Sequence, residues 1–184
     1  MKIKGYISII VFSVLLLSFQ SPSGLFSTKT GKISFRSDAP LELISASSDQ
    51  MYGKFNSASK EFAFSVRVRS FKGFNSKLQE EHFNENYLES GKFPTAKFYG
   101  KIIEDINYGE DGTYTVRAKG NLTIHNITQE RIIRITLKIR DKLVEARTGF
   151  TVLLADHNIP IPKVVHEKLA SEIKVDVMAE LIRE

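Results

Sequence analysis

Long runs of alternating apolar and polar residues constrain this chain more than any other feature of its sequence. In the segment 113–124 the even-numbered side chains are mostly apolar and the odd-numbered ones mostly polar, and the segment 171–182 shows the same period with the opposite numbering. A period of two is typical of a β-strand with one face against a core and the other in water. A dozen extended residues span roughly 40 Å at about 3.4 Å per residue, so the pattern predicts a tall sheet.

The alternation recurs often enough to predict a whole architecture. The segments that carry it are 30–37, 42–48, 60–69, 95–106, 113–124, 130–140, 143–154 and 171–182. Short turn signals at 108–112 and 125–128 separate neighbouring segments, which favours an antiparallel up-and-down order. Eight such strands can close on themselves and so remove their exposed edges. We therefore predict an all-β, eight-stranded antiparallel β-barrel, with a two-sheet sandwich as the structural alternative.

Two longer segments interrupt the strands. Between 76 and 89 the alternation stops, and Leu78, Phe83 and Tyr87 recur at helical intervals among acidic residues, which predicts a short amphipathic helix. We call the segment 75–92 the helical insert. The segment 156–170, which we call the rim loop, contains Pro160 and Pro162 and so cannot form a regular strand. Both segments are expected at the rim of the barrel, where they would cover an opening.

The first residues have the outline of a secretory signal peptide. Lys2 and Lys4 precede an apolar run at 7–19, and small or polar residues follow it. We predict a signal peptide at 1–22, with cleavage between about residues 18 and 24, a single barrel domain at 25–184, and a periplasmic or secreted mature protein. An uncleaved membrane anchor is the alternative. The chain has no Cys, so it forms no disulfide and has no acceptor for a lipid-anchoring thioether.

The charge pattern argues against a nucleic-acid partner. The chain has 26 Lys and Arg against 21 Asp and Glu, a formal net charge of +5. The basic residues are spread singly over the strands, and no dense basic run with interleaved aromatic residues occurs. We interpret these residues as a solvated outer face, with contact to an anionic surface as the alternative.

Three motifs make the chain resemble a known family. His-Phe-x-x-x-Tyr-Leu at 82–88 is followed by Phe-Pro-x-Ala-x-Phe at 93–98, and Gly-x-Leu-Thr-Ile-His occurs at 120–125. In this order they resemble the YceI-like polyisoprenoid-binding family, over nearly the whole chain from about 33 to 181. Asn126 stands where the family usually has Gly. After Gly, Asn best tolerates the positive φ that a tight turn needs.

The resemblance implies a lipocalin-like barrel with a short helical insert near its mouth and a long apolar ligand in its lumen. The ligand would be a polyisoprenoid, an isoprenoid quinone or a fatty-acyl molecule, bound by a monomer or homodimer that contacts the membrane transiently. Eight lumen side chains are expected to bind it: Phe62, Phe64, Val66, Phe98, Leu122, Ile124, Phe150 and Val175. Four aromatic side chains are expected at the mouth: Phe71, Phe74, Phe83 and Tyr87.

Catalytic chemistry finds little support in the sequence. The four histidines, His82, His125, His157 and His166, lack the spacing of a zinc motif, and no Cys can join them. Nucleophile-elbow, phosphate-loop and dinucleotide motifs are also missing, so we expect no enzyme, no cofactor and no metal. Two alternatives remain: a lipid hydrolase or isomerase that uses His82 with Glu85, and a solid barrel that presents its loops to a protein partner.

Overall fold

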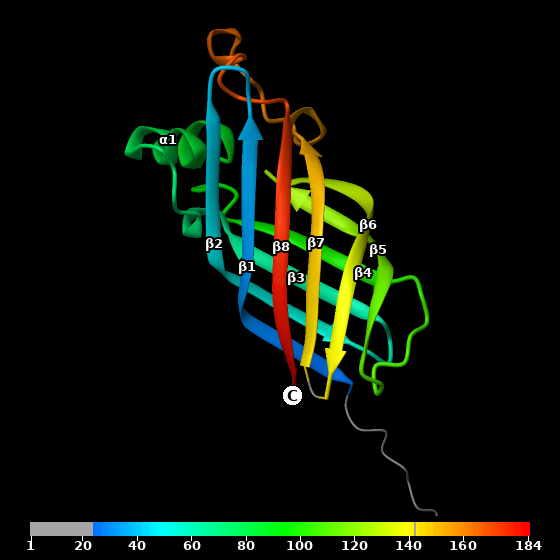
Figure 1. Cartoon of the computed structure of the whole chain (residues 1–184). Helices are drawn as coiled ribbons and strands as arrows, with labels where there is room; N and C mark the ends of the chain where they lie inside the picture. Colours follow the sequence, from blue (N-terminus) through cyan, green and yellow to red (C-terminus); the bar gives the residue numbers. More distant parts are fainter. Residues whose placement is uncertain (1–23, 142) are drawn as a thin grey trace, which may run out of the picture.

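The computed structural model describes residues 24–141 and 143–184, which form a closed barrel (Figure 1). The predicted signal peptide at 1–22 lies outside these residues. Each strand is antiparallel to the next, and β8 closes the barrel against β1. The strands are β1 (Leu25–Asp38), β2 (Leu43–Asn56), β3 (Glu61–Arg67), β4 (Thr95–Ile102), β5 (Gly112–Ile124), β6 (Ile127–Arg140), β7 (Leu143–Leu153) and β8 (Glu172–Arg183). The predicted eight-stranded antiparallel barrel is confirmed, and the sandwich alternative is wrong.

Alternation along the strands separates the lumen from the outer wall. In β4, Ala96 and Phe98 are partly buried and face inward, whereas Lys97 and Tyr99 are exposed. Phe98 pairs with Leu122 on β5, and two positions further along Gly100 pairs with Gly120. A Cβ atom on Gly120 would lie 2.4 Å from the carbonyl oxygen of Tyr99. The two strands therefore approach each other here more closely than any side chain would permit.

Two strands extend well beyond their predicted bounds. β2 continues to Asn56 rather than ending at 48, and β1 begins at Leu25 rather than at 30. The polar sequence Ser-Asp-Gln at 48–50 resembles a turn, but the strand continues through it; the buried positions shift there from even to odd numbers, and Met51 and Phe55 beyond it are buried. In the opposite direction, β4 ends at Ile102 rather than at 106. The ends of β1 and β2 thus follow the burial of apolar side chains rather than the polarity of the local sequence.

The helical insert forms where it was predicted, but only its first part is α-helical. Ser76 caps α1 (Lys77–His82) by accepting a hydrogen bond from the backbone N–H of Gln79 at 3.2 Å. A π-helical turn, η2 (Phe83–Tyr87), follows directly. The chain enters the insert through η1 (Val68–Ser70), a 3₁₀ turn in place of the predicted end of the third strand.

Rim elements gather at one end of the barrel. The rim loop contains η4 (Lys163–Val165) and starts within η3 (Leu154–His157), and it lies at the same end as α1 and the β1–β2 turn (Figure 1). Two hydrogen bonds connect elements at this end: Leu41 N–H donates to the Glu167 carbonyl at 2.9 Å, and Ala170 N–H donates to the Ser37 side-chain Oγ at 2.9 Å. None of the helices in the described residues has the length and apolar character to cross a bilayer.

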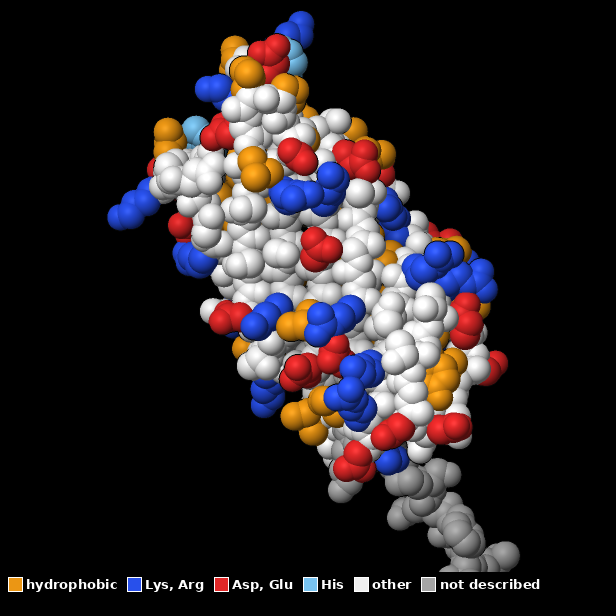
Figure 2. Space-filling model, in the orientation of Figure 1, with side chains coloured by type: hydrophobic (Ala, Val, Ile, Leu, Met, Phe, Trp, Pro, Cys, Tyr) orange, Lys and Arg blue, Asp and Glu red, His pale blue; other side chains and the backbone are white. Residues whose placement is uncertain are grey.

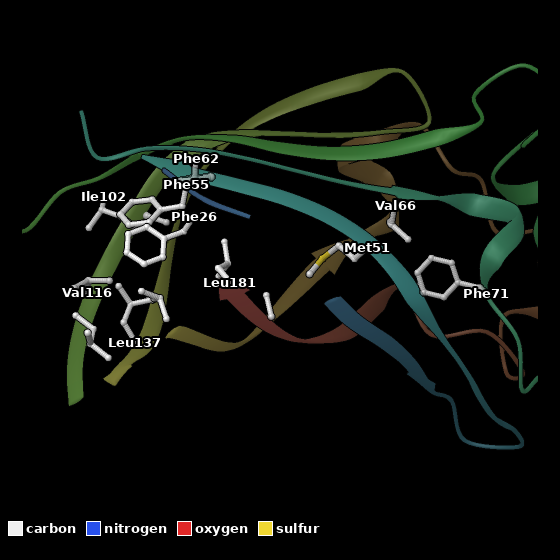
Figure 3. Close-up of a cluster of buried hydrophobic side chains, with 14 of the residues drawn as sticks. Phe26, Met51, Phe55, Phe62, Val66, Phe71, Ile102, Val116, Leu137 and Leu181 are labelled. Atoms are coloured by element: carbon white, nitrogen blue, oxygen red, sulfur yellow. The ribbon is translucent and has the colours of Figure 1, made fainter. Parts of the chain in front are cut away.

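The opposite end of the barrel is filled by side chains (Figure 3). Phe55 contacts Phe26 and Tyr108, with ring centroids 6.2 Å and 5.0 Å away. Burial and the nearby carboxylates of Asp105 and Glu104 raise the pKa of Tyr108 to about 12. We call this cluster the basal plug; its other buried members include Phe62, Ile102, Val116, Leu137, Ile139, Val144 and Leu181.

One seam of the wall lacks a complete ladder. Within the described residues, β6 and β7 pair only from Thr136↔Arg147 to Arg140↔Leu143, near the base. Above that point single side chains bridge the two strands: Thr148 Oγ1 donates to the Arg134 carbonyl at 2.7 Å, and Arg131 Nη2 donates to the Thr151 carbonyl at 2.8 Å. The upper seam is thus joined by side chains rather than by backbone pairing.

Charges of both signs are mixed over the outer wall (Figure 2). Cross-strand pairs such as Lys101 with Glu61 at 3.1 Å and Lys119 with Glu130 at 3.3 Å involve side chains that are more than half exposed. Exposed pairs of this kind contribute about 0–1 kcal/mol each. The side of the molecule seen in Figure 2 is therefore a solvated face, without a concentration of one sign of charge.

Candidate ligand-binding site

A chamber of about 470 Å³ lies between the upper barrel wall and the helical insert. This volume falls within the range of about 300–1,000 Å³ that is usual for small-molecule sites. The wall of the chamber is mainly apolar, with contributions from the strands, the insert and the rim loop. The upper half of the barrel thus contains a cavity, whereas the basal plug is solid.

Most of the predicted site residues line this chamber. From the predicted lumen set these are Val66, Leu122, Ile124, Phe150 and Val175. All four predicted mouth residues line it as well: Phe71, Phe74, Phe83 and Tyr87. The structure shows that these nine side chains line one chamber. That they bind a ligand stays a prediction.

The other three predicted lumen residues lie deeper. Phe62, Phe64 and Phe98 line a second pocket of about 100 Å³, which shares Val66 and Leu122 with the chamber. Phe62 also packs against Phe98, with ring centroids 4.9 Å apart, and belongs to the basal plug. We call this second space the deep pocket, and these aromatic rings form its floor.

Sequence analysis missed one wall of the chamber. Ile33 and Phe35 on β1 face the chamber, as do Val152 on β7 and Ile173 on β8. Residues 33 and 35 have the inward parity of a segment that was predicted as a strand, so the signal was present in the alternation. The predicted set nevertheless contained no residue of this strand.

An aromatic cluster closes the chamber beneath the insert. The ring of Phe83 lies 5.8 Å from that of Phe71 and 5.1 Å from that of Phe74, centroid to centroid, in tilted arrangements. Tyr87, one turn further on, also faces the chamber, and burial raises the pKa of its hydroxyl. The insert therefore covers the chamber with apolar side chains, although none of its helical residues is fully buried.

Polar side chains on the chamber wall are concentrated at the mouth. Glu42 from the β1–β2 turn accepts a hydrogen bond from the Gln79 amide of α1. His82 and Lys168 line the same opening from the insert and the rim loop. Below this level the deep pocket has almost wholly apolar surface. A guest with one polar end would therefore place that end at the mouth.

His125, in the β5–β6 turn, links the insert to the rim. It forms a hydrogen bond with the Glu89 carboxylate through Nε2 at 2.9 Å and one with the His157 carbonyl through Nδ1 at 3.2 Å. His125 and Asn126 both have positive φ, 49° and 60°, which confirms the expectation for Asn126.

His157 is a buried polar residue that sequence analysis did not single out. It is fully buried, and its Nδ1 donates to the Ile127 carbonyl at 3.0 Å. Its Nε2 has no hydrogen-bond partner among the described residues. Burial lowers the pKa of His157, and the Ile127 carbonyl opposes this shift. The next residue, Asn158, ends η3 with φ 53°, which is the αL geometry that Asn and Gly favour.

The enzyme alternative gains no geometric support. His82 is exposed at the rim, and among the described residues its ring makes no hydrogen bond to Glu85. In residues 24–141 and 143–184, no group of three or more His, Asp or Glu side chains is arranged to hold a metal ion. The chemistry that this site offers is burial of apolar surface.

The sequence matches the YceI-like domain over residues 3–181. The chain belongs to the YceI-like family. A UPF0312 protein of Pseudomonas fluorescens strain Pf-5 is 24% identical over 135 residues, which are 72% of this YceI-like chain and 59% of the relative. The chain thus spans about 59% of the length of that curated relative.

Solved structures share this YceI-like fold at low identity. A polyisoprenoid-binding domain from Saccharophagus degradans, implicated in plant cell wall breakdown, superposes with a TM-score of 0.72 at 12% identity, covering 88% of this chain and 99% of that one. Burkholderia cenocepacia BcnA gives 0.65 at 15%, covering 82% and 95%. The Campylobacter jejuni YCEI protein gives 0.56 at 12%, covering 99% of both chains. At these identities the likeness concerns the fold.

Proposed function

We propose that this YceI-like protein is an exported, non-enzymatic carrier that binds one long apolar ligand inside its barrel. The observation that carries the proposal is the apolar chamber of about 470 Å³ beneath the aromatic cluster of Phe71, Phe74 and Phe83. The ligand would be a polyisoprenoid, an isoprenoid quinone or a fatty-acyl molecule. The polyisoprenoid-binding domain of Saccharophagus degradans supports a ligand of the lipid class.

Burial of an apolar chain is sufficient for useful affinity. Each buried methylene contributes about 0.8 kcal/mol, so a chain of roughly 15 to 20 carbons contributes about 12 to 16 kcal/mol before costs. Association and ordering remove about 4 to 15 kcal/mol. The favourable part of this range allows micromolar or tighter binding without any polar recognition.

Organic extraction tests the proposal directly. The protein would be purified from its own host without detergent and extracted with chloroform and methanol, and the extract would be analysed by mass spectrometry. We expect one class of long-chain lipid in near-equimolar amount. A protein purified in parallel with a Phe150→Glu substitution, which places a charge in the chamber wall, should lack it. A lipid-free wild type that also binds no added lipid would contradict the carrier.

An interaction module is the second candidate, and the basal plug is the observation that favours it. The lower half of the barrel is as solid as an ordinary core, with Phe26, Val116 and Ile139 at most 3% exposed. Such a scaffold could display the rim loop and the β5–β6 turn to a protein partner. The extraction experiment separates the two candidates, because a module needs no lipid.

Export belongs to the proposal as well. Lys2, Lys4 and the apolar run at 7–19 motivate a mature chain that starts between about residues 18 and 24. Intact-mass measurement of protein recovered from the periplasm or medium would give the first residue. A full-length product that pellets with membranes would contradict this part of the proposal.

A further inference from the structure

The space inside the barrel ends at the basal plug. Below the deep pocket, Phe62 and Phe98 are in contact and the basal plug fills the remaining length. The plug seals the lower end with rings from separate strands, since Phe26 lies on β1, Phe55 on β2 and Phe62 on β3. A long guest therefore cannot pass through the barrel and leave at the base (Figure 3).

The volumes of the chamber and the deep pocket limit how much of a chain the barrel can hold. At the roughly 30 Å³ that a heavy atom occupies in liquid water, which is close to the volume of a methylene group, a chamber of about 470 Å³ holds roughly 16 heavy atoms. The deep pocket of about 100 Å³ adds roughly three more. A chain with twice as many carbons would leave half of its apolar surface outside.

The two spaces are arranged in series. Five side chains line both of them, so the chamber leads into the deep pocket: Ile33, Val66, Ala96, Leu122 and Phe150. Ala96 is the smallest of the five and lies next to Phe98 in the inward alternation of β4. A chain that has filled the chamber passes Ala96 to reach the floor at Phe98 and Phe62.

The placement of polar side chains along the cavity determines which end of a ligand enters first. Glu42, Gln79, His82 and Lys168 surround the mouth, whereas the deep pocket is almost wholly apolar. Lys168 makes no ion pair or side-chain hydrogen bond within the described residues. The polar end of an amphiphile stays hydrated at this rim, and the tail occupies the interior.

We infer that the ligand is a single-chain amphiphile of roughly 15 to 20 carbons that enters tail first, and that the floor at Phe98 and Phe62 limits its length. The inference rests on the proposed carrier function and narrows its ligand. It selects a fatty-acyl chain or a short prenyl chain over polyprenyl chains of forty or more carbons.

A chain-length series tests the inference. Delipidated full-length mature protein would be loaded with dansyl-undecanoic acid, which would then be displaced by saturated fatty acids from decanoic to docosanoic acid, by farnesol and by solanesol. We expect affinity to rise roughly fourfold per added methylene, to level off near 16 to 18 carbons, and to be no better for solanesol than for farnesol. Affinity that rises steadily to solanesol would overturn the length limit and leave the carrier function intact. Failure to bind the dansyl probe and every lipid of the series would overturn both.

Two variants of the passage test the position of the floor. Phe98→Ala deepens the pocket and should move the plateau to longer acids by about three or four carbons, whereas Ala96→Leu obstructs the passage and should move it to shorter ones. Tyr99→Ala, on the outer face of the same strand and 48% exposed in the wild type, is the matched control and should leave the plateau in place.

Each variant would first be compared with the wild type by circular dichroism. If Ala96→Leu does not fold, the chain-length series on Phe98→Ala and on the wild type still tests the position of the floor. A plateau that stays at the same chain length in a folded Phe98→Ala variant would overturn the assignment of the floor.

Discussion

The ring of Phe83 in the helical insert stacks on the ring of Phe35 in β1, with centroids 5.3 Å apart and planes 13° from parallel. Phe35 also contacts Phe71 and Phe74, so one inward residue of the first strand organises the aromatic cover of the chamber. The insert is held to the barrel by these rings and by the hydrogen bond between Glu89 and His125.

Removing the ring of Phe83 should loosen the cover. Phe83→Ala is expected to lower the free energy of unfolding by about 1 to 3 kcal/mol, less than for a fully buried Phe because the side chain is partly exposed. Hydrogen exchange of the amides at 77–88 should rise more than that of β5. Lys77→Ala, on the exposed side of α1, is the control and should change stability by less than about 0.5 kcal/mol. Unchanged exchange at 77–88 would contradict the role of the ring.

Replacing His82 separates binding from catalysis. His82→Gln removes titration and keeps hydrogen-bonding capacity. Because the His82 ring is exposed and makes no hydrogen bond within the described residues, lipid retention should change by less than about 1 kcal/mol. Quantitative mass spectrometry of extracted wild type and variant measures this. Complete loss of retention in a folded variant would count against a purely apolar site.

Stability should fall as pH drops below about 6.5, in part through His157. In the unfolded chain a histidine takes up a proton near pH 6.5, but burial lowers the pKa of His157 in the fold. Just below pH 6.5 the folded state therefore binds fewer protons than the unfolded state, and stability decreases with falling pH. His157→Gln should flatten this slope, although its stability at neutral pH should be lower by about 1 to 3 kcal/mol.

Urea midpoints between about pH 5 and 7 would measure the slope. His166→Gln is the control, because His166 is exposed and contacts only the nearby Lys163 carbonyl. An identical slope in His157→Gln and the wild type would show that other groups cause the acid sensitivity.

No side chain should fit where Gly100 of β4 and Gly120 of β5 pair. Gly120→Ala would place a Cβ atom 2.4 Å from the Tyr99 carbonyl oxygen, which is backbone and cannot move aside cheaply. We expect a loss of roughly 3 kcal/mol or more, seen in urea or thermal unfolding. Gly91→Ala should be mild, since the nearest atom is the end of Arg69 at 3.9 Å. Similar midpoints for the two variants would be inconsistent with the geometry.

The barrel itself was predictable because alternation and turn signals are local. The αL turn at Asn126 was also predictable, since Asn is one of the few residues that adopts positive φ without strain. The ends of β1 and β2 were not, because Ser-Asp-Gln at 48–50 looks like a turn until Met51 and Phe55 are seen to be buried.

That error concealed the most consequential feature of the site. Phe26 and Phe55 lie in the two strand portions that the pattern missed, and they form much of the basal plug. Phe62, predicted as a lumen side chain, lines the deep pocket and also belongs to the basal plug. The mouth residues were found because the helical motif at 82–88 placed Phe83 and Tyr87 directly.

The incomplete seam between β6 and β7 has a mechanical consequence. When every pair of neighbouring strands is hydrogen-bonded along its whole length, the circumference of a barrel is fixed, because widening it would break backbone hydrogen bonds along a whole strand. Here the upper parts of β6 and β7 are joined by side-chain hydrogen bonds from Thr148 and Arg131, each of which contributes about 0.5 to 1.5 kcal/mol. Ile133, Ile135 and Thr148 at this seam line the deep pocket, so among the described residues the wall of the deep pocket is held together there by fewer bonds than the rest of the barrel.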